Sequence, residues 1–143
     1  KILDEEGISL KWGDDFTPEA EQVLCKHADP IIITKWPTDV RAFYSMPEPG
    51  NEKICRAYDI LYRGREILSG AQRIHDYSKL VVEMKRRKMN PKNFSFYLDA
   101  FRFGTPPHAG WSFGLERLTM QILGLKNIRE AVLWPRDRTR LTP

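Results

Sequence analysis

Apolar residues recur at helical spacing in four segments of the chain. The first segment begins with Thr17 as a cap, followed by a proline in the first turn and by acidic residues. The last segment is amphipathic, because its leucines and isoleucine fall on one face: Leu115, Leu118, Ile122 and Leu123. We therefore predict helices over residues 17–27, 77–88, 94–104 and 115–124.

Shorter runs rich in β-branched and aromatic residues predict strands between these helices. Residues 55–64 and 65–75 meet at Gly64, which predicts an antiparallel hairpin. The run IIIT at 31–34 is predicted to be a short buried strand, and residues 47–53 a turn-rich loop. Further strands are predicted over 40–46, 108–114 and 131–134. Because the elements alternate irregularly, we expect an α+β fold, an antiparallel β-sheet flanked by helices, rather than a doubly wound sheet.

The composition is that of an ordinary globular domain, with 41% hydrophobic and 29% charged residues. No apolar run approaches the roughly 18 residues of a membrane span, and residues 1–13 do not form a signal peptide. We therefore expect a cytoplasmic protein with no membrane partner. Cys25 and Cys55 are expected to be free thiols, and the histidines are too scattered to indicate a zinc site.

The net charge of +4 indicates only a mild preference for polyanions. The densest basic run, at 85–88, is more typical of a solvated helix face, with contact to nucleic-acid phosphates as the alternative. In the tail, Arg136 is the best placed to face a site, whereas Arg138 and Arg140 are expected in solvent.

Polar residues concentrate in the stretch GREILSGAQRIH at 64–75. Glu66 and Ser69 offer oxygen ligands suited to a hard cation such as magnesium on a nucleotide triphosphate. Arg73 offers a planar fork suited to a carboxylate. A polar strand face with a surface ion pair is the alternative, and local chemistry alone favours it.

A second stretch with site chemistry is HAGWSFGLERL at 108–118. Gly110 and Gly114 permit a close approach to the backbone, and the following helix directs its N-terminal amides beyond the strand. Arg117 lies in the first turn, where the helix dipole disfavours a cation. It is either recruited for an anion or paired with Glu116 or another acid.

Several stretches, taken in order, resemble one family. GLERL resembles motif 3 of the class II aminoacyl-tRNA synthetases. Four further stretches resemble the aspartyl subfamily of the archaeal and eukaryotic kind: FYSMPEPGN, EILSGAQRIHD, FRFGTPPHAG and the closing PRDRTRLTP. The resemblance covers about Ile31 to Pro143. It implies a six-stranded antiparallel sheet flanked by helices and closed by one parallel strand. It also implies that aspartate attacks the α-phosphate of ATP, and that the aspartyl group then passes to tRNA.

The resemblance also implies roles for single residues. Glu66 would bind Mg²⁺ and ATP, and Ser69 would bind Mg²⁺ beside the amino acid. Arg73 would pair with the side-chain carboxylate of aspartate. ATP would be held by Gly114, Leu115, Glu116 and Arg117, with Arg117 the catalytic residue on the triphosphate. His108 would lie nearby.

Parts of the family pattern are absent from this sequence. Motif 1, which forms the dimer interface, motif 2, whose arginine binds the α-phosphate, and the anticodon-binding domain would all precede Lys1. Residues 1–143 are therefore expected to be the C-terminal part of a catalytic domain, inactive alone, in a protein that dimerises through the missing part. An asparagine-forming relative, an asparaginyl relative and a non-catalytic synthetase-derived module remain alternatives.

A regular strand cannot bring the three polar residues of 64–75 together. Side chains alternate with period two, so Glu66 would face away from Ser69 and Arg73. One extra residue in the strand, a β-bulge, would reset the alternation. We predict this bulge at Ser69 and Gly70, since glycine tolerates unusual dihedral angles.

Overall fold

One antiparallel sheet organises the chain. The computed structural model describes residues 1–142. The strands are β1 (Ile31–Pro37), β2 (Pro47–Glu48), β3 (Asn51–Tyr62), β4 (Arg65–Gln72) and β5 (Ala109–Phe113). The α-helices are α1 (Ile2–Glu5), α2 (Pro18–His27), α3 (Tyr77–Arg86), α4 (Ser95–Arg102) and α5 (Leu115–Leu123). Short 3₁₀ helices are η1 (Thr38–Val40), η2 (Pro91–Phe94) and η3 (Ile128–Ala131).

The strand order is β1-β3-β4-β5, with β2 beside β3, and every pair is antiparallel. The predicted α+β class is therefore confirmed. The predicted hairpin joins β3 to β4, and its turn residues Arg63 and Gly64 both have positive φ, the conformation of a type I′ turn. The parallel strand that the resemblance implies is not among the strands of residues 1–142.

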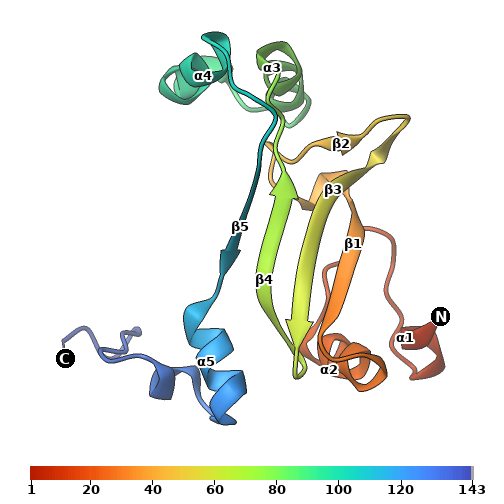
Figure 1. Cartoon of the computed structure of the whole chain (residues 1–143), viewed down its shortest axis with the longest axis vertical. Coiled ribbons are helices and arrows are strands. Elements are labelled where there is room, and N and C mark those ends of the chain that lie inside the picture. The colour runs from red at the N-terminus through yellow and green to blue at the C-terminus, as the bar shows by residue number, and fades with distance from the viewer. Residues whose placement is uncertain (143) are drawn as a thin grey trace.

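Helices pack at both ends of the sheet (Figure 1). α3 and α4 lie together beyond one end, whereas α2 and α5 lie toward the opposite end. The Thr17 hydroxyl caps α2 by accepting from the Ala20 amide at 3.3 Å, as the sequence predicts. Within residues 1–142, no helix combines the length and apolarity that crossing a bilayer requires.

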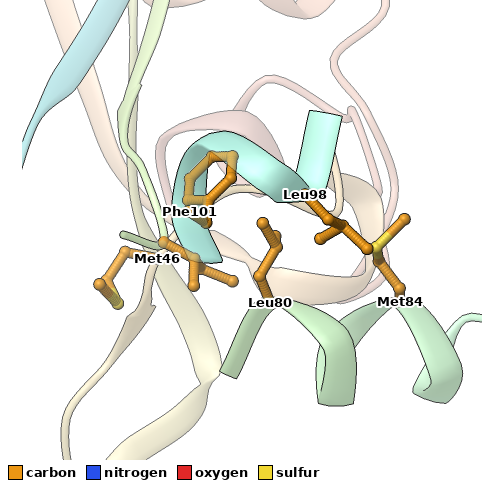
Figure 2. Close-up of a cluster of buried hydrophobic side chains, with 6 residues drawn as sticks. Met46, Leu80, Met84, Leu98 and Phe101 are labelled. Atoms are coloured by element: carbon orange, nitrogen blue, oxygen red, sulfur yellow. The ribbon is translucent and has the colours of Figure 1, made fainter. Parts of the chain in front are cut away.

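The main apolar core joins α3 and α4 to the end of the sheet. Leu80 and Met84 of α3 pack against Leu98 and Phe101 of α4, and Met46 approaches from the segment before β2 (Figure 2). A second cluster lies on the sheet itself and contains Trp36, Cys55, Ala57 and Ala71. Cys25 and Cys55 are free thiols, as predicted.

Two predicted strands are wrong. Residues 40–46 form the end of η1 and a turn, in which the Ser45 amide donates to the Ala42 carbonyl at 2.9 Å. Only a single bridge, Ser45 to Arg73, remains of the expected strand. Residues 131–134 pair with no strand of the described chain, and Leu133 and Trp134 are exposed. Aromatic and β-branched content favours a strand only where a partner strand is available.

One burial prediction also fails, and one predicted apolar face lies largely in solvent. The run 31–34 lies in β1, which is an edge strand, and Ile32 is 61% exposed rather than buried. Helix α5 forms as predicted, but Leu115, Ile122 and Leu123 of its apolar face are exposed and Met120 is its buried residue. A periodic apolar face therefore predicted the helix but not what covers it.

Candidate active site

A β-bulge places the polar residues of β4 on one face, at a position other than the predicted one. In the β3–β4 ladder Asp59 pairs with Ser69 and Leu61 pairs with Glu66, so Ile67 has no partner. Ile67 is thus the extra residue, while the ladder is regular across Ser69 and Gly70. Because Asp59 and Leu61 are two residues apart, they share a face, and their partners Ser69 and Glu66 share it too. The predicted shared face is confirmed and the predicted bulge position is wrong.

Gly70 does not serve the bulge but a close packing contact on the opposite face. A Cβ atom at Gly70 would lie 2.7 Å from Cζ of Tyr58 and 2.8 Å from Cβ of Trp111. Such distances are far below ordinary van der Waals contact, so only glycine fits beneath the Tyr58 ring.

A cavity of about 230 Å³ opens over the face that carries Ser69. Ser69 and Arg73 both line it, whereas Glu66 lies on the same face but outside the lining. The remaining lining residues come from the segment before β2, from β3, from β4 and from β5: Arg41, Ala42, Tyr44, Ser45, Ala57, Gly70, Ala71, Trp111 and Ser112.

The guanidinium group of Arg73 lies between an aromatic ring and a glycine. Its carbon is 4.3 Å from the centre of the Tyr44 ring, a cation–π contact. On the other side, a Cβ atom at Gly110 would come within 3.2 Å of Nη2 of Arg73. Gly110 therefore permits the close approach that the sequence predicted. Nη2 of Arg73 donates to the Gly110 carbonyl at a long 3.4 Å, but among the described residues no carboxylate forms an ion pair with Arg73, so its charge remains available to a ligand.

The structure adds Asp59 and Arg41, which sequence reasoning did not select. Asp59 lies directly across from Ser69, is buried, and accepts a hydrogen bond from Arg41 Nη2. Arg41 also lies over the Trp36 ring, 4.2 Å from its centre. Oδ1 of Asp59 is buried with no hydrogen-bond partner among residues 1–142. A lone acid within the apolar alternation of β3 was the available signal for Asp59; nothing in the sequence indicated Arg41.

Glu66 and Arg117 form a pair at the start of β4. Nη1 of Arg117 lies 3.3 Å from Oε1 of Glu66 and donates to the Glu66 carbonyl at 3.0 Å. Of the two alternatives for Arg117, the structure shows pairing with an acid, and that acid is not Glu116. Burial raises the pKa of Glu66, the charge of Asp59 raises it further, and Arg117 only partly offsets the two. A bound cation would relieve this unfavourable charge.

Other predicted site residues lie farther out. Gly114 caps the start of α5, and Leu115 and Glu116 are exposed in its first turn. His108 does not line the cavity, although its carbonyl accepts from the Arg73 amide at 2.9 Å. The tail arginines are exposed and do not line the cavity either: Arg136, Arg138 and Arg140.

The donor atoms fit a hard cation better than a soft one. Glu66, Asp59 and Ser69 offer carboxylate and hydroxyl oxygens on one face, and one Asp59 oxygen lacks a partner. Magnesium binds such oxygens and usually takes its remaining ligands from substrate phosphates and water. Within the described part of the chain, no cluster of three or more His, Cys, Asp or Glu side chains could hold a metal alone. These residues therefore fit a magnesium ion that arrives with a nucleotide.

Comparison with known proteins identifies the family. The family model "tRNA synthetases class II (D, K and N)" matches residues 8–138. The chain belongs to this family. Within it, the chain is 51% identical over 142 residues to the aspartate–tRNA(Asp) ligase of Picrophilus torridus. It is 48% identical over 143 residues to the aspartate–tRNA(Asp/Asn) ligase of Methanocaldococcus jannaschii. Each match covers 99% of this chain but 33% of the relative, so this class II synthetase chain spans about a third of their length.

Solved class II synthetase structures share the fold. The aspartyl-tRNA synthetase of Entamoeba histolytica superposes with a TM-score of 0.92 at 41% identity. The asparaginyl-tRNA synthetase of Pyrococcus horikoshii superposes with a TM-score of 0.93 at 37% identity. Both matches cover 99% of this chain, and 30% and 34% of the respective solved chains.

Proposed function

We propose that this chain supplies part of the active site of an aspartate–tRNA ligase, which forms aspartyl-adenylate from aspartate and ATP and transfers the aspartyl group to tRNA. The observation that carries the proposal is the state of Arg73. Its guanidinium is stacked on Tyr44, lines the cavity and has no carboxylate partner among residues 1–142. A fixed, unpaired cation in a cavity is suited to the side-chain carboxylate of aspartate. The identity to aspartate–tRNA ligases supports the same substrate.

The chain's residues would act by positioning and by charge neutralisation. The attacking α-carboxylate of aspartate is already ionised, so no general base is required. Arg73 would orient aspartate through its side chain, while Ser69 lies on the same cavity surface. Glu66, Asp59 and Ser69 would hold Mg²⁺. When bound, this ion neutralises phosphate oxygens during the in-line displacement. Arg117, next to Glu66, would stabilise charge on the triphosphate.

We further propose that residues 1–143 are the C-terminal part of the catalytic domain. The curated relatives are about three times as long as the stretch that matches. The groups that bind the α-phosphate, the dimer interface and the anticodon-binding part would then lie in the remainder of the protein. The full-length enzyme, rather than this chain alone, would bind ATP, aspartate and tRNA.

Asparagine is the second candidate substrate, since an asparaginyl-tRNA synthetase shares the fold. Its amide carries no charge and would leave the Arg73 guanidinium without a counter-ion. The names of the two archaeal ligases differ only in the tRNA, Asp or Asp/Asn, and both contain aspartate. Aspartate is therefore the better candidate.

The test is ATP–pyrophosphate exchange by the full-length enzyme with either amino acid. We expect exchange with aspartate. Arg73→Lys should lower kcat/KM for aspartate about 10- to 150-fold, because a charge-assisted hydrogen bond contributes roughly 1.5–3 kcal/mol. Arg65→Lys is the matched control on β4. The Arg65 side chain is 41% exposed, and its Nη1 lies as far as 4.0 Å from Oε2 of Glu21, so we expect this substitution to change kcat/KM little. Exchange with asparagine alone would favour the asparaginyl reading, and exchange with neither would overturn the proposal.

A further inference from the structure

Arg41 reaches the candidate site from an irregular segment between β1 and β2. This segment contains η1, and Arg41 follows it directly. The side chain must be aimed accurately, because it meets the buried carboxylate of Asp59 and the face of Trp36 at once. The Thr38 hydroxyl ties the start of η1 to β3 by donating to the Glu52 carbonyl at 2.7 Å, but the bond from the Arg41 amide to the Thr38 carbonyl is long, at 3.4 Å. Such a long bond does not by itself fix the segment.

A second arginine adds hydrogen bonds at both ends of this turn, including the Arg41 end, which the Thr38 hydroxyl does not reach. Arg87, at the C-terminal end of α3, donates from Nη1 to the Arg41 carbonyl at 2.5 Å. It donates from Nη2 to the Thr38 carbonyl at 2.6 Å. One planar guanidinium group therefore bonds the carbonyls at both ends of the turn that carries Arg41, a geometry that a lysine ammonium does not reproduce.

Glu83 orients this guanidinium. It lies one turn earlier on α3, is buried, and accepts from Nε of Arg87 at 2.6 Å. Burial alone would raise the pKa of Glu83, but hydrogen bonds from Arg86 and Arg87 outweigh burial and hold its pKa below the usual value. Glu83 thus stays ionised and keeps Arg87 in its rotamer.

Arg86 provides a contrast within the same basic run. It also donates to Glu83, and its other partner at 2.6 Å is the carboxylate of Asp39, which lies in η1 but is 79% exposed, so this surface pair holds the segment only weakly. It bonds no carbonyl of the segment. The run 85–88 is therefore not simply a solvated face, since Arg86 and Arg87 are both engaged within the chain and only Arg87 reaches the backbone before the site.

We propose that Arg87, oriented by Glu83, is a positioning residue for the candidate active site: it fixes the backbone at Thr38 and Arg41 and thereby holds the Arg41 guanidinium against Asp59 at the edge of the cavity. Asp59 lies across from Ser69, and Arg41 lines the cavity together with Arg73. Release of the segment moves a cation out of the aspartate cavity and leaves a buried carboxylate uncompensated. This assignment uses the proposed function for its kinetic readout only.

The test compares Arg87→Lys and Arg87→Met with Arg86→Lys in the full-length enzyme. In pyrophosphate exchange, Arg87→Met should raise the KM for aspartate about tenfold, the loss expected for one charge-assisted hydrogen bond. Arg87→Lys should raise it less, because lysine still reaches one carbonyl. kcat should change less than KM, and Arg86→Lys should match the unaltered enzyme. Equal effects at Arg86 and Arg87, or no effect at Arg87, would overturn the assignment.

A double-mutant cycle separates positioning from mere stabilisation. If Arg87 acts through Arg41, then Arg87→Met should add little to the KM of an Arg41→Gln enzyme. Additive effects would refute the coupling. Hydrogen exchange of the amides of residues 38–45 gives an answer independent of activity, and we expect faster exchange in Arg87→Met but not in Arg86→Lys. If the unaltered enzyme shows no aspartate-dependent exchange, the proposed function fails, and the amide exchange alone decides this inference.

Discussion

Asp59→Asn should destabilise the protein strongly, although it changes a single atom. The Asp59 side chain is 2% exposed and its partner Arg41 is 18% exposed, so both charges lie largely out of water. The substitution keeps the shape of the side chain but removes the negative charge. Arg41 would then remain a nearly buried cation without a counter-ion.

The size of the effect follows from the burial of the pair. Breaking a buried pair by removing one partner costs about 3–5 kcal/mol. Arg41 keeps some contact with solvent and with the Trp36 ring, so the lower end applies. For a chain of 143 residues, about 3 kcal/mol corresponds to a fall in melting temperature of about 10 °C.

Thermal unfolding followed by circular dichroism at neutral pH provides the measurement. Glu48→Gln is the matched control, because its pair with Arg56 has both side chains 40% exposed and a solvent-exposed pair contributes little to stability. The double substitution Arg41→Gln with Asp59→Asn should recover part of the loss, since no unpaired charge remains. The reasoning is refuted if Asp59→Asn lowers the melting temperature no more than Glu48→Gln does, or if the double variant melts at a lower temperature than Asp59→Asn.

Three further outcomes are expected. Burial raises the pKa of Glu66, so its ionised form opposes folding above that pKa, and the opposition disappears as the side chain protonates. Glu66→Gln should therefore raise the melting temperature near pH 7 but not at about pH 3.5, and should weaken the magnesium dependence of adenylate formation in the full-length enzyme. Arg117→Ala should lower adenylate formation about 10- to 150-fold while the KM for aspartate changes little, as single-turnover and steady-state kinetics can show. Gly70→Ala should cost about 1–3 kcal/mol in denaturant unfolding because its Cβ would collide with Tyr58 and Trp111, whereas a cost near zero would contradict the packing.

Local patterns predicted most helices and the central hairpin because their signals are local. Thr17 and Pro18 mark the start of α2, and Gly64 marks the turn between β3 and β4. The strand predicted over residues 131–134 failed because strand formation depends on a neighbour, and no sequence window contains that information. The exposure of Leu123 on α5 has the same cause, since periodicity does not reveal what packs against a face.

The site was predictable in its residue types and less so in its geometry. Family resemblance selected Glu66, Ser69 and Arg73, and the requirement that they share a face predicted a bulge. Its position at Ile67 was missed because glycine was taken as the marker, whereas the structure uses Gly70 to admit the Tyr58 ring. Asp59 was missed because it lies on the partner strand and approaches Ser69 only through the sheet.

The bulge at Ile67 gives β4 an unusual numerical property. Glu66, Ser69 and Arg73 are separated by three and then four residues, which is the spacing that aligns side chains along a helix. A strand with one extra residue reproduces that alignment at a single place. A sequence search that assumes strict strand alternation would therefore assign these three residues to opposite faces. A helical-wheel analysis would assign them to one face, but of a helix that does not form here. Deleting Ile67 should leave Glu66 and Ser69 two residues apart in a regular strand and so keep them on one face, whereas a one-residue insertion between Ser69 and Arg73 should turn Arg73 away from both.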